Sequence, residues 1–488
     1  MIAEEKLVKI VGKGNVSCDQ AALDEYATDM SFVNAVKPDY VVKPRNADDV
    51  AKLVNLAKET LTPLVPVSSG PPHFRGDTVP STGGAVMVDL SGMKKTIRVD
   101  RRNRVAMVEP GVTFGELIPA VAREGLQLNL PLLPRKSKSV VGSMLEREPV
   151  IMPKYHWDIS DPLACVEVIF GNGDMFRTGA AAGPGNIEEQ WAAGGVQKEA
   201  AGPSSSSWYR LIQGAQGTMG IVTWASVRCE LLPRVEEPFL VGSSQLDRLL
   251  EFTHWLIRLR LVNECFTLNN SNLAAIMAKK WPSDYQAIKD TLPTWVLFFN
   301  IAGYDYLPEE RVSGQIEDMM DIAQRVGVEP VGNIGRVSAA KLLTVANKPS
   351  GEPYWKIRHK GACHDIFFVT IYNKLPGLIE AMYDLADEAG YPVSDMGGYL
   401  QPIVQGTNCH GELNLFYDPK NPRESDRVRE LATSAIKSLM DKGAFFSRPY
   451  GESASMIINR DAATATALKK VKAIADPDHV MNPGKLCF

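Results

Sequence analysis

A stretch of helical periodicity near the N-terminus is the feature that most constrains the fold. Its apolar side chains recur at i, i+3, i+4 and i+7, which is the spacing of a helix packed on a sheet. They are Val50, Leu53, Val54 and Ala57. The acidic first turn at residues 46–50 is typical of a helix start. Strands are predicted after this helix at residues 64–67 and 85–90.

The chain is long enough to need more than one core. Its 488 residues exceed what a single hydrophobic core usually holds, so we expect two lobes. The pattern changes after residues 231–234, where a strand-like stretch ends. Beyond this point helical stretches alternate with strands, as in an α+β lobe. The helical stretches include 246–260 and 376–389, and the strands are 295–301, 366–371 and 412–417.

Composition and charge argue against several classes of function. The chain is 45% hydrophobic and 23% charged, as globular proteins are. Its net charge of -4 argues against binding to nucleic acid or membrane surfaces, which would favour a clustered basic excess. No apolar run approaches membrane-spanning length. The first six residues are acidic and polar, unlike a secretory signal, so we expect a cytoplasmic protein.

The seven cysteines are scattered along the chain without a C-x-x-C pair. Dispersed cysteines in a chain that lacks a signal peptide are typical of reduced thiols. We therefore expect neither an iron–sulfur cluster nor a structural zinc site.

Four motifs follow one another in the order of a known enzyme family. They are DYVVKP (39–44), EPGV (109–112), GAQGTMGIVT (214–223) and DPDHVMNPGK (476–485). Together they resemble the FAD-linked oxidases of the vanillyl-alcohol-oxidase and para-cresol-methylhydroxylase (PCMH) superfamily, especially its glycolate-oxidase and D-lactate-dehydrogenase flavoprotein subunits. The resemblance implies an α+β fold in which a two-part FAD-binding lobe of the PCMH type carries an α+β cap, the substrate domain. The expected ranges are 1–233 and 421–488 for the FAD-binding lobe and 234–420 for the cap.

The first flavin loop of this family is glycine-rich, so that backbone N–H groups approach a pyrophosphate. Here the loop is SSGPPHFRGDT (68–78), in which two prolines remove amide donors. We expect serine, histidine and arginine side chains to replace them, because arginine suits a diphosphate. The expected cofactor contacts of this loop are Ser69, Gly70, His73, Arg75 and Gly76. Two alternatives stay open: a loop that no longer binds FAD, and a covalent flavin on His73, as in some relatives.

Three further segments of the resemblance are expected to hold FAD. They are the small-residue turn at 139–143, the glycine-rich loop at 214–223, and the tail, whose lysine could carry charge toward a pyrophosphate or the isoalloxazine. The expected contacts are Gly142, Ser143, Gly217, Thr218, Gly220, Ile221, Asn482 and Lys485. Residues 144–157 depart from the family and either shape the pocket or form a surface loop. Residues 192–207 resemble a loop insertion.

A strand in the cap carries three polar residues in register. Side chains alternate faces along a strand, so His410, Glu412 and Asn414 project together while Leu413 and Leu415 face the core. Three polar groups on an apolar strand are costly unless they line a cavity. In such a cavity the histidine could take the hydroxyl proton of an alcohol while hydride leaves for flavin N5. The alternative is a strand with one wet face.

Two further residues are candidates for substrate binding. Arg358 resembles the residue with which hydroxy-acid dehydrogenases of the superfamily hold a carboxylate, although with its basic neighbours it could form only a charged helix face. Tyr450 lies in a segment that resembles one reaching the pocket, where it either bonds a substrate oxygen or is structural. Relatives acting on D-2-hydroxy acids carry a metal-binding histidine cluster with a Gly-Asp-Gly core. That core is missing here, so no metal is expected.

The resemblance implies an FAD-dependent oxidoreductase that oxidises the hydroxyl-bearing carbon of a small organic substrate. Arg358 favours a 2-hydroxy acid. The alternatives are a para-substituted phenol or benzylic alcohol, favoured by the missing metal cluster, and a non-catalytic flavin-fold subunit of a larger redox complex. Without iron–sulfur cysteines, electrons would leave through dioxygen, a carrier or a partner subunit of a homo- or hetero-oligomer.

Overall fold

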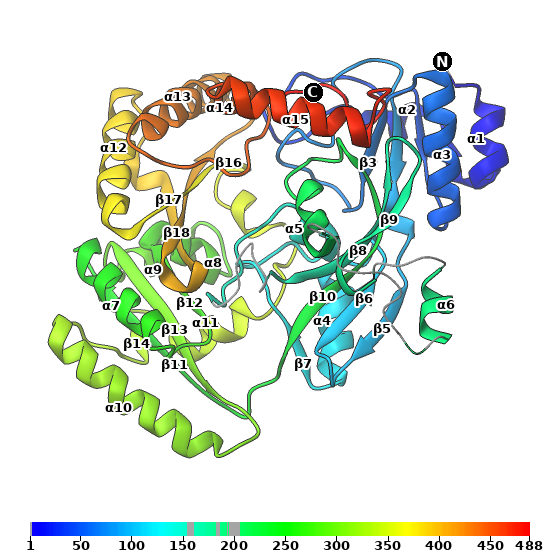
Figure 1. Ribbon diagram of the computed structural model, residues 1–488. Coiled ribbons are helices and arrows are strands. Elements are labelled where there is room, and N and C mark those ends of the chain that lie inside the picture. Colours follow the sequence, from blue (N-terminus) through cyan, green and yellow to red (C-terminus); the bar gives the residue numbers. More distant parts are fainter. Residues whose placement is uncertain (1, 154–160, 182–185, 193, 195–204) are drawn as a thin grey trace.

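The computed structural model describes the chain except residues 1, 154–160, 182–185, 193 and 195–204. The expected loops at 144–157 and 192–207 therefore lie partly outside the described residues. Figure 1 shows two sheets on the side of the N-terminus and a third sheet on the opposite side. A two-stranded ribbon, β14 (Asn333–Ile334) with β15 (Val337–Ser338), lies beside the third sheet.

The periodic helix packs on a four-stranded sheet. The strand order is β1 (Val16–Ser17), β2 (Tyr40–Val42), β4 (Val86–Asp89) and β3 (Leu64–Val67), with β2 and β3 parallel to β4. Helix α3 (Ala47–Thr60) begins after Asn46, whose side chain accepts the N–H of Asp49 and so satisfies a free donor of the first turn. All four apolar residues with helical spacing are buried, as predicted. The sheet is accompanied by α1 (Glu4–Val11) and α2 (Gln20–Ala27).

The second sheet is built around one long strand. β10 (Gly220–Leu231) pairs antiparallel with neighbours on both sides. The other strands are β5 (Thr96–Asp100), β6 (Val105–Val108), β7 (Leu126–Leu128), β8 (Leu163–Phe170) and β9 (Met175–Arg177). The helices in this part are α4 (Phe114–Arg123), α5 (Val140–Leu145) and α6 (Ile187–Ala192). β10 begins at Gly220, inside the second glycine-rich segment (214–223), so this segment is anchored to the centre of the sheet.

The third sheet is antiparallel and six-stranded. Its order is β11 (Val235–Ser243), β13 (Trp295–Gly303), β12 (Cys265–Asn269), β17 (Met396–Ile403), β18 (Asn408–Tyr417) and β16 (Ala362–Thr370). One face packs on α7 (Leu246–Arg258), α10 (Pro308–Val326), α12 (Leu375–Glu388) and α13 (Pro422–Asp441). The other packs on α8 (Asn270–Met277), α9 (Ser283–Lys289) and α11 (Ala339–Ala346). Leu413 and Leu415 face the first of these cores, as the alternation predicted.

The C-terminal residues first cover the third sheet and then return to the other two. α13 packs against β16 and β18, and α14 (Ser453–Ile458) and α15 (Ala462–Ala475) follow. In Figure 1 α15, in red, runs across the molecule toward the first sheet. The tail then pairs with β3, because Leu64 N donates to Val480 O (2.7 Å) and Asn482 N donates to Leu64 O (2.8 Å). The division of the chain at residues 233 and 420 stays a prediction.

A buried ion pair holds the tail in place. Lys472 of α15 pairs with Asp476, and both side chains are almost inaccessible to solvent. Lys472 also donates to the carbonyls of Thr218 and Met481, while Asp476 accepts the N–H groups of Val480 and Met481. Burial lowers the pKa of Lys472, and the Asp476 carboxylate opposes that shift. The pair therefore joins α15, the tail and the loop before β10.

Replacing Lys472 by methionine should destabilise the protein strongly. The change leaves the Asp476 carboxylate buried without its counterion, which typically costs roughly 3–5 kcal/mol. Lys470→Met, on the exposed side of the same helix, should change the free energy of unfolding by no more than about 0.5 kcal/mol. Urea unfolding of the two variants measures the difference, and equal stabilities would show that the buried pair contributes little.

Candidate active site

A cleft lies between the loops of the first two sheets and one face of the third. Its cavity volume is about 220 Å³. One side is formed by loops at 66–78, 131–149 and 212–222. The other side is formed by residues 354–365 and by side chains of β17, β18 and residues 448–450. The cleft thus brings the loops expected to hold a cofactor to the strand expected to hold a substrate.

The 68–78 loop is held by contacts that use several of its polar groups. Ser139 N donates to the hydroxyl of Ser69 (3.0 Å), and Gly70 N donates to a neighbouring backbone carbonyl (3.3 Å). Gly76 N donates to Asp29 (2.6 Å). Ser69 lines the cleft, whereas Gly70 and Gly76 are not among its lining residues. The two glycines therefore serve the loop's own conformation.

His73 presents a free ring nitrogen in this loop. Its Nε2 is buried and, among the described residues, has no hydrogen-bond partner, and the residue lines the cleft. Burial, with the nearby charge of Arg135, lowers the pKa of His73 to about 4. The imidazole is therefore neutral at pH 7. A neutral imidazole that lines the cleft keeps open both a hydrogen bond to a cofactor and a covalent attachment.

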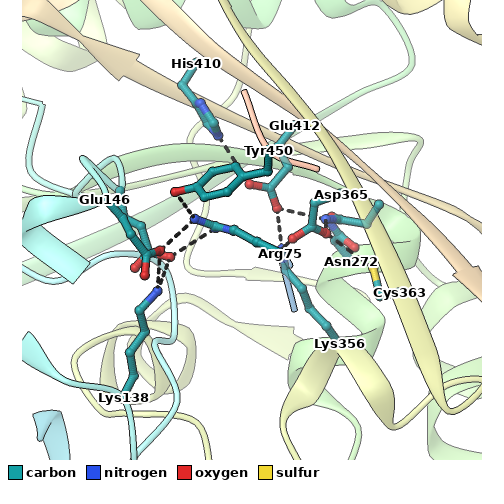
Figure 2. A network of polar contacts seen from close by, with 12 residues as sticks. Arg75, Lys138, Glu146, Asn272, Lys356, Cys363, Asp365, His410, Glu412 and Tyr450 are labelled. Carbon is teal, nitrogen blue, oxygen red and sulfur yellow. Dashed lines mark hydrogen bonds and ion pairs between the residues drawn. The ribbon is translucent and has the colours of Figure 1, made fainter. Parts of the chain in front are cut away.

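Arg75 lies in a charge network on the loop side of the cleft (Figure 2). Its Nη1 is 2.7 Å from Glu146 and its Nη2 is 3.2 Å from Glu148. Lys138 pairs with the same two carboxylates at 2.9 and 2.7 Å. Burial acts to raise the pKa of Glu148, but Lys138 and Arg75 outweigh it and hold this pKa well below the ordinary value. Arg75 thus already has carboxylate partners, and a diphosphate would have to compete with them.

A second network occupies the cap side of the cleft. Lys356 Nζ lies 2.6 Å from a carboxylate oxygen of Asp365 and 2.6 Å from one of Glu412. Asn414 donates to both carboxylates, at 2.6 and 2.8 Å. The register of β16 and β18 places Asp365 opposite Asn414. Despite burial, Lys356 and His410 hold the pKa of Glu412 well below its ordinary value. The Glu412 carboxylate and the Lys356 ammonium are therefore charged, and the contacts with Asp365 and Asn414 fix their positions.

His410 stands behind Glu412. Its Nε2 lies 3.3 Å from Glu412 Oε2, and its side chain is 2% exposed. Glu412 lines the cleft, but His410 is not among the lining residues. Burial lowers the pKa of His410 and Glu412 opposes that shift. The predicted trio of polar residues on this strand is thus brought together, with Glu412 in front.

Arg358 is not brought into the cleft. Its Nε donates to Pro353 O (2.9 Å), and it lines a separate hollow. The 3-10 turn η5 (Trp355–Ile357) sets the directions of these side chains. Within it Lys356 points into the cleft, whereas Arg358, just after the turn, points away from it. The sequence identified a basic cluster correctly but selected the wrong member for the cleft.

Arg448 is a buried cation of the cleft that was not predicted from the sequence. It lines the cleft and is 4% exposed. Its Nε and Nη1 are buried and, within the part of the chain that the structure describes, have no hydrogen-bond partner. The guanidinium lies 4.2 Å from the centre of the Phe367 ring. Burial, with the charge of Arg75, lowers the pKa of Arg448. Its neighbour Tyr450 also lines the cleft and lies 3.5 Å from Arg75.

Other cleft residues were also not singled out from the sequence. Nothing in the sequence distinguishes Lys138 or Gly214 from the other residues of their loops. Asp365 gave a signal, because its carboxylate directly precedes the apolar run that was predicted as a strand at 366–371.

The glycines of the second loop are needed for packing. Gly217 has φ +72°, and a Cβ there would lie 2.5 Å from Pro66 Cγ. A Cβ on Gly220 would lie 2.4 Å from the carbonyl oxygen of Ile169. Both glycines and Ile221 line the cleft. Larger residues at Gly217 and Gly220 would therefore disturb the fold itself, whatever they do to a cofactor.

The remaining expected contacts connect loops to one another. Thr218 Oγ1 donates to Ala215 O (2.7 Å), and Ser143 Oγ donates to Glu148 (2.6 Å). Asn482 donates to Asp77 O (2.9 Å) and Gln216 O (2.7 Å), and Lys485 donates to Gly76 O (2.7 Å). Of the expected residues outside the first loop, Gly142 lines the cleft, whereas Ser143, Thr218, Asn482 and Lys485 do not. The tail thus positions the loops from behind.

Among the described residues, no three His, Cys, Asp or Glu side chains cluster as metal ligands would. None of the helices in the described ranges combines the length and the apolar character that crossing a bilayer requires.

Comparison with known proteins shows the family. The family described as FAD binding domain matches residues 38–179. The glycolate oxidase subunit GlcD of Bacillus subtilis is 23% identical over 99% of this chain and 96% of that protein. The mitochondrial D-lactate dehydrogenase [cytochrome] of Arabidopsis thaliana is 30% identical over 93% of this chain and 75% of that protein. The chain belongs to the PCMH family of FAD-linked oxidoreductases.

A solved structure agrees with this oxidoreductase in fold. Para-cresol methylhydroxylase with substrate bound superposes with a TM-score of 0.82, at 21% identity, over 98% of this chain and 95% of that chain. The expected α+β fold, an FAD-binding lobe with a cap, is therefore confirmed, and FAD is the cofactor of this enzyme.

The cleft of this FAD-dependent enzyme fits its cofactor on the loop side. Gly214 lines the cleft at φ +70°, and a Cβ there would meet nothing within 4 Å. His73, whose buried Nε2 has no hydrogen-bond partner among the described residues, lines the same cleft. The free space beside the Gly214 backbone and the unpaired ring nitrogen of His73 both suit a nucleotide cofactor. We propose that Ser69, His73, Gly142, Gly214, Gly217, Gly220 and Ile221 hold FAD.

Gly214→Ala should weaken FAD binding without unfolding the protein. Its methyl group would enter the open part of the cleft, and overlap of this kind costs about 1–3 kcal/mol, or roughly 10–100-fold in FAD affinity. Gly84→Ala is the matched control, because Gly84 also has positive φ and free space but does not line the cleft. Flavin absorbance per protein and melting temperature separate the two effects. Equal flavin content in both variants would place the cofactor away from Gly214.

Proposed function

We propose that the substrate is a small 2-hydroxy acid, whose carboxylate is held by Arg448 while its hydroxyl-bearing carbon is oxidised. One observation carries the proposal: a buried guanidinium in the cleft with two donors that, among the described residues, are unpaired. An unpaired buried charge is costly, and a bound carboxylate would relieve that cost through charge-assisted hydrogen bonds. The names of the relatives, a glycolate oxidase subunit and a D-lactate dehydrogenase, support the same substrate class.

The proposed acceptor of the hydroxyl proton is the His410 imidazole, which Glu412 orients. Glu412 is the member of this pair that lines the cleft, and His410 Nε2 lies 3.3 Å from its outer oxygen. Because Lys356 keeps the pKa of Glu412 low, the carboxylate alone is a weak base. Because the charged Glu412 carboxylate can only accept a hydrogen bond, the Nε2 that faces it carries the hydrogen of the neutral imidazole, and Nδ1 is the nitrogen left to take a proton.

The other cleft residues orient the substrate. Lys356 and Asn414 fix the inner oxygen of Glu412, so the carboxylate has one oxygen free for a hydroxyl group and for His410. Burial raises the pKa of Tyr450 above its ordinary value, which keeps the phenol protonated as a donor to a substrate oxygen. FAD, when bound, supplies the acceptor for two electrons from the substrate carbon.

A para-substituted phenol or benzylic alcohol is the second candidate. Aromatic side chains of Phe74, Tyr354 and Tyr450 line the cleft, and Arg448 could hold a phenolate as well as a carboxylate. The fold likeness to para-cresol methylhydroxylase agrees with this candidate. The charged and mutually fixed side chains of the cleft argue against a non-catalytic subunit.

The electron acceptor is proposed to be a carrier or a partner subunit. One relative is named a subunit of glycolate oxidase, and another carries cytochrome in its name. Reduced enzyme mixed with dioxygen and with a one-electron dye would separate an oxidase from a dehydrogenase.

Arg448→Met should raise the concentration of 2-hydroxy acid needed for half-maximal flavin reduction by roughly 10–100-fold. This is the loss of a charge-assisted hydrogen bond of about 1.5–3 kcal/mol. Arg358→Met, the matched control, should behave like the unmodified enzyme, because its guanidinium lies outside the cleft. Anaerobic stopped-flow reduction with 2-hydroxy acids and para-hydroxybenzyl alcohols measures both variants. A phenol substrate is indicated if only the benzyl alcohols reduce the flavin.

His410→Ala should slow flavin reduction by roughly 10²–10⁴-fold, the usual contribution of a general base, with the flavin spectrum intact. In the unmodified enzyme the rate should fall as the pH drops below the pKa of His410, because the protonated imidazole cannot accept a proton. Burial places that pKa below the ordinary 6.5. This acid limb should be absent in His410→Ala and kept in His254→Ala, a control on α7. An unchanged pH profile in His410→Ala would remove His410 from the proton path.

A further inference from the structure

A second, smaller cavity opens beside the cleft. It has a volume of about 110 Å³ and lies between β16, α13 and residues 31–33, with residues 446–453 completing its wall. Its wall includes a cluster of apolar side chains, which are Phe32, Val33, Phe367, Ala432, Ile436 and Phe446. We call this cavity the side pocket.

The side pocket and the cleft share one wall. Both are lined by Arg75, Arg448 and Tyr450. The guanidinium groups of Arg448 and Arg75 lie 4.2 and 5.2 Å from the ring centre of Phe367, on the side-pocket side of this wall. A molecule bound to the Arg448 guanidinium therefore lies at the junction of the two cavities.

The rim of the side pocket is polar. Arg429 and Glu452 both line it and form an ion pair with side chains 45% and 52% exposed. A mostly apolar interior behind a charged rim admits a short apolar group and limits its length. In another protein a cavity of about 150 Å³ binds benzene, so the volume here suits a branched alkyl chain of about four carbons.

We propose that the side pocket holds the apolar substituent of the substrate, and that Arg448 at its neck holds the carboxylate of the same molecule. The substrate would then be a 2-hydroxy acid with a branched alkyl side chain, larger than glycolate or lactate. This specification rests on the proposed function, because it places the hydroxyl-bearing carbon in the cleft and its substituent in the side pocket.

The test uses carboxylates that cannot be oxidised, so that binding is measured apart from catalysis. Acetate, butanoate and 4-methylpentanoate are titrated into the flavin-loaded enzyme by calorimetry. Each buried methylene should tighten binding by about fourfold. Arg448→Met should weaken all three acids, and the uncharged amide of 4-methylpentanoate should bind equally well to Arg448→Met and to the unmodified enzyme.

Two variants fill the side pocket. Thr433→Phe at its rim and Ala432→Leu in its wall should each remove the dependence on chain length, so that 4-methylpentanoate binds no more tightly than acetate. Ser434→Phe, on the next residue of α13 but outside the lining, is the control and should keep the dependence. The use of two variants guards against a folding defect in either one.

The outcomes separate this proposal from the proposed function. No dependence on chain length in the unmodified enzyme, or a dependence that survives both pocket-filling variants, overturns the side-pocket proposal even if 2-hydroxy acids reduce the flavin. A dependence that only the filling variants remove supports it even if no hydroxy acid is oxidised. Competition by a short-chain quinone, without any dependence on chain length, would assign the pocket to an electron acceptor and overturn the proposal.

Discussion

The buried pair of Lys472 and Asp476 is the interaction on which the rest of the site depends. It closes the tail onto the carbonyl of Thr218, while Asn482 and Lys485 reach the carbonyls of the first flavin loop. Loops that lack regular hydrogen bonding need partners for their backbone groups, and here one short segment supplies several of them. Lys485 was expected to contact the cofactor directly. Its structural role is to hold the loops that form the cleft.

Within the cleft, charge is nearly balanced by internal pairing. Arg75 and Lys138 share two glutamates, and Lys356 bridges Asp365 and Glu412. Pairing of this kind offsets the desolvation of each charge, and it fixes side chains that would otherwise have many rotamers. Arg448 departs from this pattern, which is why it indicates a ligand more strongly than any of the paired cations. Because most buried charges of the cleft are paired within the protein, a buried charge alone is weak evidence for a binding site.

Local patterns predicted local structure well and long-range pairing poorly. The spacing of Val50, Leu53, Val54 and Ala57 identified α3, and alternation along β18 placed Glu412 and Asn414 on one face and Leu413 on the other. Period and alternation are properties of a few neighbouring residues. The choice between Lys356 and Arg358 depended on the phase of a single 3-10 turn, and the role of Arg448 depended on which strands surround it. Neither the direction of Lys356 nor the surroundings of Arg448 can be predicted from a few neighbouring residues.

The position of the tail in the chain has a consequence for biosynthesis. The loops of the cleft emerge from the ribosome early, but Lys472, Asn482 and Lys485 follow only after the cap has been made. At typical synthesis rates of about 5–20 residues per second, the loops wait for tens of seconds without the contacts that hold them. FAD therefore meets its finished site only after translation of residues 472–485, and a nascent chain interrupted within the cap would expose an unclosed cleft to chaperones and proteases.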